Sequence, residues 1–228
     1  MKIDEYDVRL LRPCVTNLIP MFKVLHETVF NFSKISPTYH YANKETVKNI
    51  FCSFHTQKIL DKSIKAYSKA HKVSYDAVVA LRPDAAVIRD IGLAELLSTQ
   101  KFSSGHIYIP NFAHFQGIND RAAYGSPDVM SVYFNRDEAF KISLATSTLK
   151  WVVNTETFLK HYLQDRRVPV KMTDMRVMRV RVDGQIPKND YDKKKMSMPK
   201  AEIARCQMMV VLNSTSMENI TVLDTTFC

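Results

Sequence analysis

The ten residues 75–84, YDAVVALRPD, decide the fold class of this chain. A short, uninterrupted apolar run of this kind predicts a strand buried on both faces, because strands covered on one face only read as an alternation of apolar and polar residues. Pro83 cannot donate a hydrogen bond to a sheet ladder, so the strand is expected to end near it. The sequence therefore predicts a buried strand with Arg82 and Asp84 at its carboxyl end.

Helices and further strands are predicted on both sides of this run. Residues 47–71 carry apolar side chains near helical spacing and predict a long amphipathic helix. Residues 106–110, HIYIP, predict a second compact strand, and Ser126-Pro127-Asp128 and Thr155-Glu156 both have the residue types of a helix start. This alternation of helices with short apolar strands indicates the α/β class.

Four other segments carry weaker patterns. Residues 177–182, VMRVRV, alternate and predict a strand with Met178 on one face and the neighbouring arginines on the other. A short helix is expected at residues 93–97 and an added strand at residues 207–212. The basic run 188–195, KNDYDKKK, is interrupted by acids and is interpreted as a solvated loop.

Composition limits the possible classes of protein. The chain has 228 residues, of which 46% are hydrophobic, so it can bury a substantial core. Neither a signal peptide nor an apolar run of about 20 residues, the length that crosses a bilayer, is found. We therefore expect a soluble, cytoplasmic protein without a membrane span. The four cysteines are scattered, which argues against a zinc ribbon or a disulfide scaffold.

The charge balance favours anionic partners without choosing among them. The chain has 32 Lys+Arg against 23 Asp+Glu, a formal net charge of +9. It contains no zinc-finger spacing, RNP-like motif or long basic helix, so we do not expect a nucleic-acid partner. Its few glycines form neither a phosphate-binding loop nor a G-x-G-x-x-G fingerprint.

Arg82 and Asp84 are the first candidates for chemistry. Ligands of open α/β sheets bind beyond the carboxyl ends of strands, where these two residues are expected. A guanidinium binds anionic phosphate oxygens, and a carboxylate binds a hard divalent cation. The alternative is an ion pair between Arg82 and Asp84 that only closes the end of the strand.

The segment 111–126, NFAHFQGINDRAAYGS, is the second candidate and is expected to form a structured loop. Gly117 and Gly125 bracket the trio Asn119-Asp120-Arg121. An amide, a carboxylate and a guanidinium held together can bind a polyhydroxyl ligand or supply a general base. The alternative is a capped turn in which the charged pair satisfies backbone groups. We expect the trio and Asp84 to converge on one shared cleft.

Four further residues have both a chemical and a structural interpretation. Glu156 is, by default, an acid that stabilises the start of its helix. His114, among aromatic residues, is more often packed than catalytic. Arg179 and Arg181 can reach phosphates, and a solvated strand face explains them equally well.

The order of these motifs resembles that of a group of GT-A-fold glycosyltransferases found in algae, fungi and the large DNA viruses of algae. It is similar to the enzymes with which chloroviruses glycosylate their major capsid protein. In this group the series runs from YD-V-x-R-x-R-x-D through IY-x-P and G-x-NDR-x-A-x-GS to a glutamate-headed helix. Here these motifs correspond to residues 75–84, 107–110 and 117–126 and to Glu156, and the resemblance covers residues 47–184.

The resemblance implies a GT-A-like, Rossmann-like mixed sheet flanked by helices. The GT-A-like domain would comprise residues 1–184, with residues 1–46 poorly matched, and residues 185–228 would form a C-terminal extension packing on the domain or trailing from it. The partners implied are a UDP- or GDP-sugar donor and a glycan or glycoprotein acceptor. If the protein is viral, its compartment is the host cytoplasm.

The resemblance also assigns roles to residues. Asp84 takes the place of the metal-binding acid and would hold Mn²⁺ or Mg²⁺ against the diphosphate. Asp120 or Glu156 would act as the base that an inverting enzyme needs. Substrate contacts are expected from the following residues: Arg82, Gly117, Asn119, Arg121 and Arg181. The alternative function is a catalytically inactive GT-A-like module that binds a carbohydrate or a nucleotide, and a basic nucleic-acid-binding protein is the third hypothesis.

Overall fold

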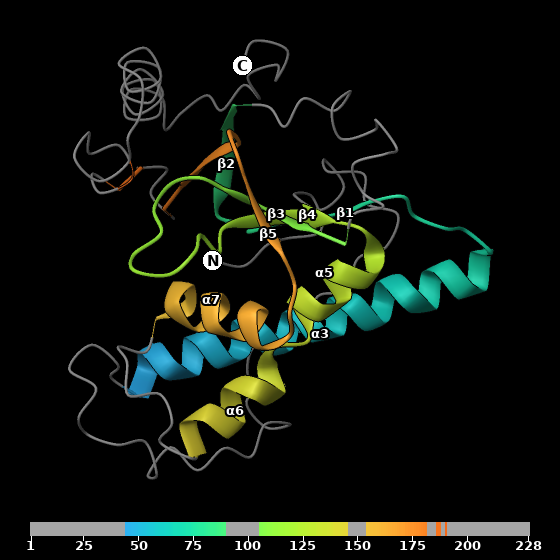
Figure 1. The fold of residues 1–228 in the computed structure, drawn as a ribbon, viewed down its shortest axis with the longest axis horizontal. Coiled ribbons are helices and arrows are strands. Elements are labelled where there is room, and N and C mark those ends of the chain that lie inside the picture. Colours follow the sequence, from blue (N-terminus) through green and yellow to red (C-terminus); the bar gives the residue numbers. More distant parts are fainter. Residues whose placement is uncertain (1–43, 90–104, 146–153, 182–185, 188–189, 191–228) are drawn as a thin grey trace, which may run out of the picture.

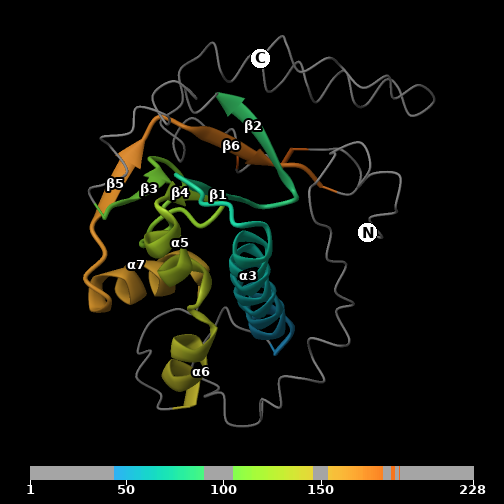
Figure 2. The same ribbon diagram turned by 90° about the vertical axis from the view of Figure 1, so that its right-hand side faces the viewer.

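The computed structural model describes residues 44–89, 105–145, 154–181, 186–187 and 190. These residues form a mixed α/β structure, as the sequence predicts. Two small sheets lie on one side of a layer of helices (Figures 1 and 2). None of the helices in these ranges is long and apolar enough to cross a membrane.

The longest element is helix α3 (Lys44–His71), which begins three residues before the predicted start. Its buried side, from Val47 to Phe54, packs into the main core. Downstream of Asp61 most side chains are exposed, and this end of the helix extends beyond α5 in Figure 1. The helix therefore combines an anchored first half with a projecting second half.

The main sheet has four strands in the order β1-β4-β3-β5. β1 (Val78–Leu81) pairs antiparallel with β4 (Ala122–Gly125), which in turn pairs antiparallel with β3 (Ile107–Pro110). β3 and β5 (Val170–Thr173) run parallel. The orientation of the strands is therefore mixed, and β1 and β5 are the edge strands among the described residues.

Three more helices complete the main layer. α5 (Pro127–Phe134) follows β4 directly, and α6 (Asp137–Ala145) comes two residues later, farthest from the sheets in Figure 2. α7 (Thr155–Asp165) leads into β5. The rings of Phe54, Phe140 and Phe158 lie with centroids 5.0–5.6 Å apart and join α3, α6 and α7. Edge and stacked contacts of this kind add to the burial energy of each ring.

A second, two-stranded sheet pairs β2 (Ala85–Arg89) antiparallel with β6 (Arg176–Arg179). Its own hydrophobic cluster lies around Val177, Met178 and Phe112, separate from the main core. Because β2 leaves β1 after a break of three residues, Arg82, Pro83 and Asp84 form the corner between the two sheets. This corner positions the first candidate site.

Several sequence predictions are confirmed. The strand at residues 106–110 is β3, which ends at Pro110 and is buried along its length. The predicted helix starts are those of α5 and α7, although the Ser126 hydroxyl makes no capping hydrogen bond and Asn154 is the N-cap of α7. The segments 93–97 and 207–212 lie outside the described residues.

Three predictions about strands are wrong. β1 is not buried on both faces, because it is an edge strand and Val79 and Leu81 are exposed. The loop predicted at residues 111–125 ends as strand β4. The alternation predicted along residues 177–182 fails in β6, since Val177 and Met178 are both buried. Elements β2, β5 and α6 have no counterpart in the sequence predictions.

Candidate functional site

A cavity of about 1380 Å³ lies where α3, the end of β1, the segment after β3 and the start of α7 meet. Asp84, Asp120 and Arg121 all line it. The predicted convergence of the acid after Pro83 with the trio at residues 119–121 is therefore confirmed for two of the three members. The third, Asn119, is fully buried and does not line the cavity.

The cavity has a charged end and an apolar wall. The charged end is formed by Arg82, Asp84, Asp120, Glu156 and Arg179. The apolar wall is formed by side chains of α3, β1, α5 and the segment after β3: Ile50, Leu60, Val79, Leu81, Phe115 and Phe134. Pockets that bind small organic ligands commonly combine a few convergent polar groups with apolar walls of this kind.

Arg82 and Asp84 form a bidentate ion pair across Pro83. The Arg82 Nε and Nη2 atoms each donate to one oxygen of Asp84 at 2.8 Å. This is the arrangement that the sequence analysis gave as the alternative to a phosphate and metal site. The pKa of Asp84 lies below its ordinary value because Arg82 donates these hydrogen bonds to its charged form.

The Arg82 guanidinium also lies in the field of two further carboxylates. Its pKa is raised chiefly by the hydrogen bonds to Asp84, and also by the negative charges of Asp120 and Glu156. Three acids therefore surround one arginine at the charged end of the cavity. The arginine remains fully charged, and an anionic ligand that approaches it must compete with Asp84.

Glu156 is the most perturbed acid of the site. Burial raises its pKa, the nearby negative charge of Asp120 raises it further, and the resulting value is about 7. A hydrogen bond from the Thr155 hydroxyl to Glu156 Oε2, at 3.1 Å, opposes this shift without cancelling it. Burial and the neighbouring negative charge both disfavour the charged form of Glu156, so near neutral pH this carboxyl group exists in both protonation states.

The first turn of α7 fixes the position of Glu156. The Asn154 side chain accepts a hydrogen bond from the Thr157 N–H at 2.6 Å and caps the helix. The Ile118 N–H donates to the carbonyl oxygen of Glu156 at 3.1 Å, which ties the segment after β3 to the same turn. Gly117 makes this close approach possible, because a Cβ there would lie 2.0 Å from the backbone of Glu156.

Asn119 organises the backbone that carries Asp120. Its Nδ2 donates to the carbonyl oxygen of Phe112 at 2.8 Å, and its Oδ1 accepts from the Arg121 N–H at 2.8 Å. The Asn119 side chain thus bridges both ends of the loop. Asp120, between the two anchored residues, is placed at the cavity, and the Tyr133 hydroxyl donates to its carbonyl oxygen at 3.3 Å.

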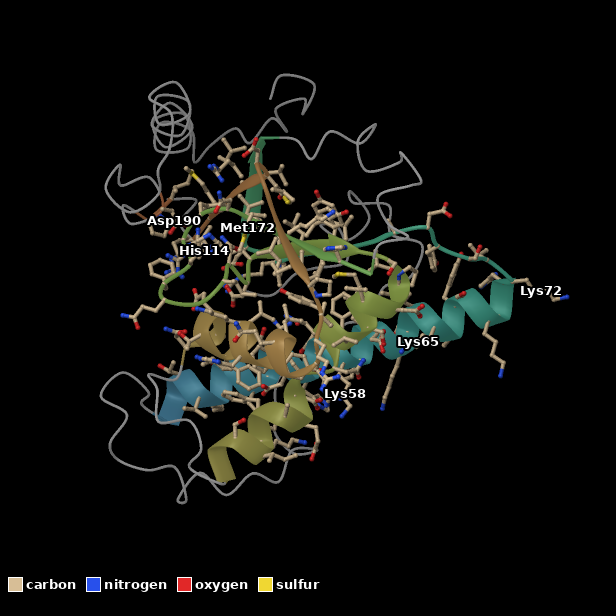
Figure 3. The ribbon with its side chains drawn as sticks, in the orientation of Figure 1. Lys58, Lys65, Lys72, His114, Met172 and Asp190 are labelled. Atoms are coloured by element: carbon tan, nitrogen blue, oxygen red, sulfur yellow. The ribbon has the colours of Figure 1, made fainter. Side chains whose placement is uncertain are left out.

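Arg121 belongs to a buried ion network. Its two terminal nitrogens donate to Asp190 at 2.8 and 3.1 Å, and Arg179 donates to the same carboxylate from its backbone at 2.9 Å and from Nη2 at 2.7 Å. Burial by itself would raise the pKa of Asp190, but the hydrogen bonds and charges of the two arginines outweigh it and lower that pKa. Figure 3 shows Asp190 on the side of the molecule where His114 lies.

The remaining residues that were predicted for the site lie outside the cavity wall. Gly117 does not line the cavity and contacts the start of α7 instead. Arg181 is exposed and is likewise absent from the cavity wall. His114 lies in the loop with its ring within hydrogen-bonding distance of Asn111 and of the Asn119 N–H, and burial lowers its pKa. His114 is therefore a packed histidine, which agrees with the structural interpretation of this residue given above.

A divalent cation such as Mn²⁺ or Mg²⁺ needs several oxygen donors around it. The described residues contain no group of three or more His, Cys, Asp or Glu side chains arranged to hold a metal ion. Both oxygens of Asp84 accept hydrogen bonds from Arg82, whose positive charge repels a cation at that position. This geometry does not fit a cation held by Asp84, and the Mn²⁺ or Mg²⁺ expected there stays a prediction.

Three residues of the site were not predicted from sequence. Asp190 stands in the run 188–195, which was interpreted as a solvated loop; that interpretation is wrong for Asp190, which is fully buried. Asn154 and Phe115 both line the cavity. A helix-cap pattern just before Thr155-Glu156 is a signal that finds Asn154, whereas no local signal reveals that Asp190 meets Arg121.

Comparison of the chain with protein-family models, with curated proteins and with solved structures finds no match.

Proposed function

We propose that this chain is a glycosyltransferase with a GT-A-like fold, which moves a sugar from a UDP- or GDP-sugar to a glycan or glycoprotein acceptor. One observation carries the proposal: the carboxyl groups of Asp120 and Glu156 line a single cavity together with the Arg82 guanidinium, and burial with the charge of Asp120 raises the pKa of Glu156 to about 7. Sugar transfer from a nucleoside diphosphate sugar uses a base for the acceptor hydroxyl and a cationic group for the departing diphosphate.

The order of the motifs along the chain supports the same function. The segments in which the sequence resembles GT-A-fold glycosyltransferases lie far apart in the chain, and three of them reach the cavity: residues 75–84, residues 117–126 and the helix headed by Glu156. If these motifs served only to form a hydrophobic core, their charged residues would not be expected to gather around one cavity.

In the proposed mechanism, Glu156 is the base. A catalytic base works best when its pKa lies near the operating pH, and that of Glu156 is about 7. Its carboxylate would accept the proton of the acceptor hydroxyl as that oxygen attacks the anomeric carbon. Asp120 has two roles in this scheme: it keeps the pKa of Glu156 high, and it offers an acceptor for sugar hydroxyls.

Arg82 would bind the diphosphate of the donor. As the bond between the anomeric carbon and the diphosphate oxygen breaks, the guanidinium stabilises the negative charge that develops on the departing UDP or GDP. Asp84 holds the arginine by its Nε and Nη2 atoms, which fixes the orientation of the guanidinium, and the diphosphate would compete with Asp84 for these donors.

A donor-hydrolysis assay tests the proposal. Wild-type protein incubated with a panel of UDP- and GDP-sugars, with and without Mn²⁺ or Mg²⁺, should release free sugar from at least one donor. Glu156→Gln should lower this rate by about 100-fold or more, the usual effect of losing a general base. Glu138→Gln, an exposed acid on α6, is the matched control and should leave the rate unchanged.

Two results would overturn the proposed catalysis. The first is an absence of turnover with every donor and metal. The second is turnover that Glu156→Gln and Asp120→Asn both leave intact. If UDP or GDP raises the melting temperature without any turnover, the alternative applies, in which the chain is an inactive nucleotide- or carbohydrate-binding module.

A further inference from the structure

Two phenylalanines of the segment between β3 and β4 have opposite surroundings. Phe112 is buried, and the guanidinium carbons of Arg121 and Arg176 lie 5.7 and 5.1 Å from the centre of its ring. Phe115, three residues later, is 41% exposed and lines the cavity. The Phe112 ring therefore supports the loop from inside, whereas the Phe115 ring is available at the wall of the cavity.

The backbone around Phe115 is held in an unfavourable conformation. Ala113, Phe115 and Gln116 all have positive φ angles, of 49°, 42° and 70°. Side-chain-bearing residues adopt this region at a cost of about 1–2 kcal/mol each, because Cβ crowds the following carbonyl oxygen. Segments that keep such strain are concentrated at functional sites, where the surrounding structure enforces them.

Two contacts fix the loop relative to the carboxyl groups of the cavity. Asn154 Nδ2 donates to the carbonyl oxygen of Phe115 at 3.3 Å, and the same Asn154 caps the helix whose first turn carries Glu156. Gly117, two residues after Phe115, packs directly on the backbone of Glu156. Phe115 is therefore attached on both sides to the turn that positions the proposed base.

We propose that Phe115 is the platform on which the sugar ring beside Asp120 and Glu156 stacks, and that it determines which sugars this cavity accepts. The inference rests on the proposed function and names a further residue of the same site. The face of an aromatic ring carries partial negative charge and attracts the C–H groups of a ring laid flat on it. A sugar ring has such an apolar C–H face, while its hydroxyl groups point to the side, where the carboxyl groups of Asp120 and Glu156, which line the same cavity, would accept hydrogen bonds.

The test measures sugar binding directly, so it does not depend on turnover. The probes are the methyl glycosides of common hexoses and pentoses, with UDP and GDP measured separately, all by ligand-observed NMR and calorimetry. We expect at least one methyl glycoside to bind the wild-type chain and Phe115→Ala to weaken it by about 5- to 10-fold, the loss of one aromatic contact. Phe115→Tyr should retain the affinity, and Phe115→Leu should lose most of it.

The controls separate stacking from stability. Phe115 is partly exposed, so its variants should melt close to the wild-type temperature. Met172→Ala is the matched control: Met172 on β5, labelled in Figure 3, is 46% exposed and does not line the cavity. This variant should change neither sugar affinity nor nucleotide affinity.

Three results would overturn the inference. The first is that Phe115→Ala leaves glycoside affinity unchanged. The second is that Phe115→Ala weakens UDP or GDP binding and not sugar binding, which would make the ring a platform for the nucleobase. The third is that no glycoside binds to the wild-type chain. The proposed function is tested by a different measurement, the hydrolysis of nucleotide sugars. If hydrolysis depends on Glu156 while glycoside affinity does not depend on Phe115, only the inference about Phe115 fails.

Discussion

Asp120 and Arg121 are adjacent in the sequence, and their charges belong to two regions with different electrostatics. The Arg121 guanidinium lies in a buried network in which Asp190 receives hydrogen bonds from both Arg121 and Arg179. Asp120 lines the cavity together with Glu156, and burial and the charge of Asp120 raise the pKa of Glu156 to about 7. In the first region charges of opposite sign compensate each other, whereas in the second two acids are placed together.

The difference shows which region supports the fold and which is available for chemistry. A buried carboxylate with two arginine partners is satisfied within the protein and stabilises the position of both arginines. The raised pKa of Glu156 lowers the stability of the protein near neutral pH, and strongly perturbed pKa values of this kind cluster at functional sites. Substitutions in the two regions should therefore affect different properties.

The largest loss of stability is expected from Asp190→Asn. This variant leaves the buried Arg121 guanidinium without its anionic partner, and breaking one side of a buried ion pair costs about 3–5 kcal/mol. Denaturant unfolding should show this loss, while Glu156→Gln should not lower the free energy of unfolding at neutral pH. A cost of Asp190→Asn below that of an ordinary surface variant would contradict the role of the network.

Gly117→Ala should be the next most damaging change. The new Cβ would lie about 2 Å from the backbone of Glu156 and Thr157, and neither backbone segment can withdraw without moving the start of α7. We expect a cost of about 2–3 kcal/mol, typical of overpacking. Gly105→Ala is the control: its Cβ would meet no atom within 4 Å, so only its positive φ of 64° opposes the substitution. Equal costs for the two variants would contradict the close approach at Gly117.

Asp84→Asn should have a smaller effect with a characteristic pH dependence. The ion pair with Arg82 is partly exposed, so its removal should cost about 1 kcal/mol or less. Because Arg82 lowers the pKa of Asp84 in the folded state, this contribution is present above the ordinary value of 3.8 and is lost as the pH falls through the lower folded value. Unfolding at neutral and at acidic pH should therefore show a difference between wild type and variant only at neutral pH, and a pH-independent difference would argue against the pair.

The smallest effect is expected from Glu138→Gln. Glu138 and Lys141 form an exposed pair one helical turn apart, with 3.3 Å between Nζ and Oε2. Pairs of this kind contribute about 0.5 kcal/mol or less. An energy of this size corresponds to a change in melting temperature of roughly one or two degrees. A much larger drop would show that exposed ion pairs contribute more to stability than we expect.

Local patterns in the sequence were sufficient for the elements with strong signals. β3 has a compact apolar run closed by Pro110, and α5 and α7 begin at recognisable starts, so all three were predicted. β4 was missed because its four residues, AAYG, include none of the β-branched types that favour strands. β4 forms a strand because it pairs with its neighbours β1 and β3. The sequence of the segment alone does not reveal these pairings.

The candidate site was predicted in part for a similar reason. Asp84, Asp120 and Glu156 lie beside strand ends or helix starts, and such positions are visible in the sequence. The ion pair between Arg82 and Asp84 was foreseen as an alternative, since the two residues are only two positions apart. The contact between Arg121 and Asp190 spans 69 residues, and Asp190 stands among lysines, so local composition indicated a solvated position.

The most direct test of the central claim is a titration of the Glu156 carboxyl group by NMR, with its signal assigned by its disappearance in Glu156→Gln. We expect a pKa of about 7 in the wild-type chain and a clear decrease in Asp120→Asn, because that variant removes the neighbouring negative charge. We also expect that folding stability decreases as the pH rises from the ordinary value of 4.5 toward 7, since the folded state holds its proton more tightly than the unfolded state does. A pKa near 4.5 that Asp120→Asn leaves unchanged would contradict the paired carboxyl groups and the base assigned to them.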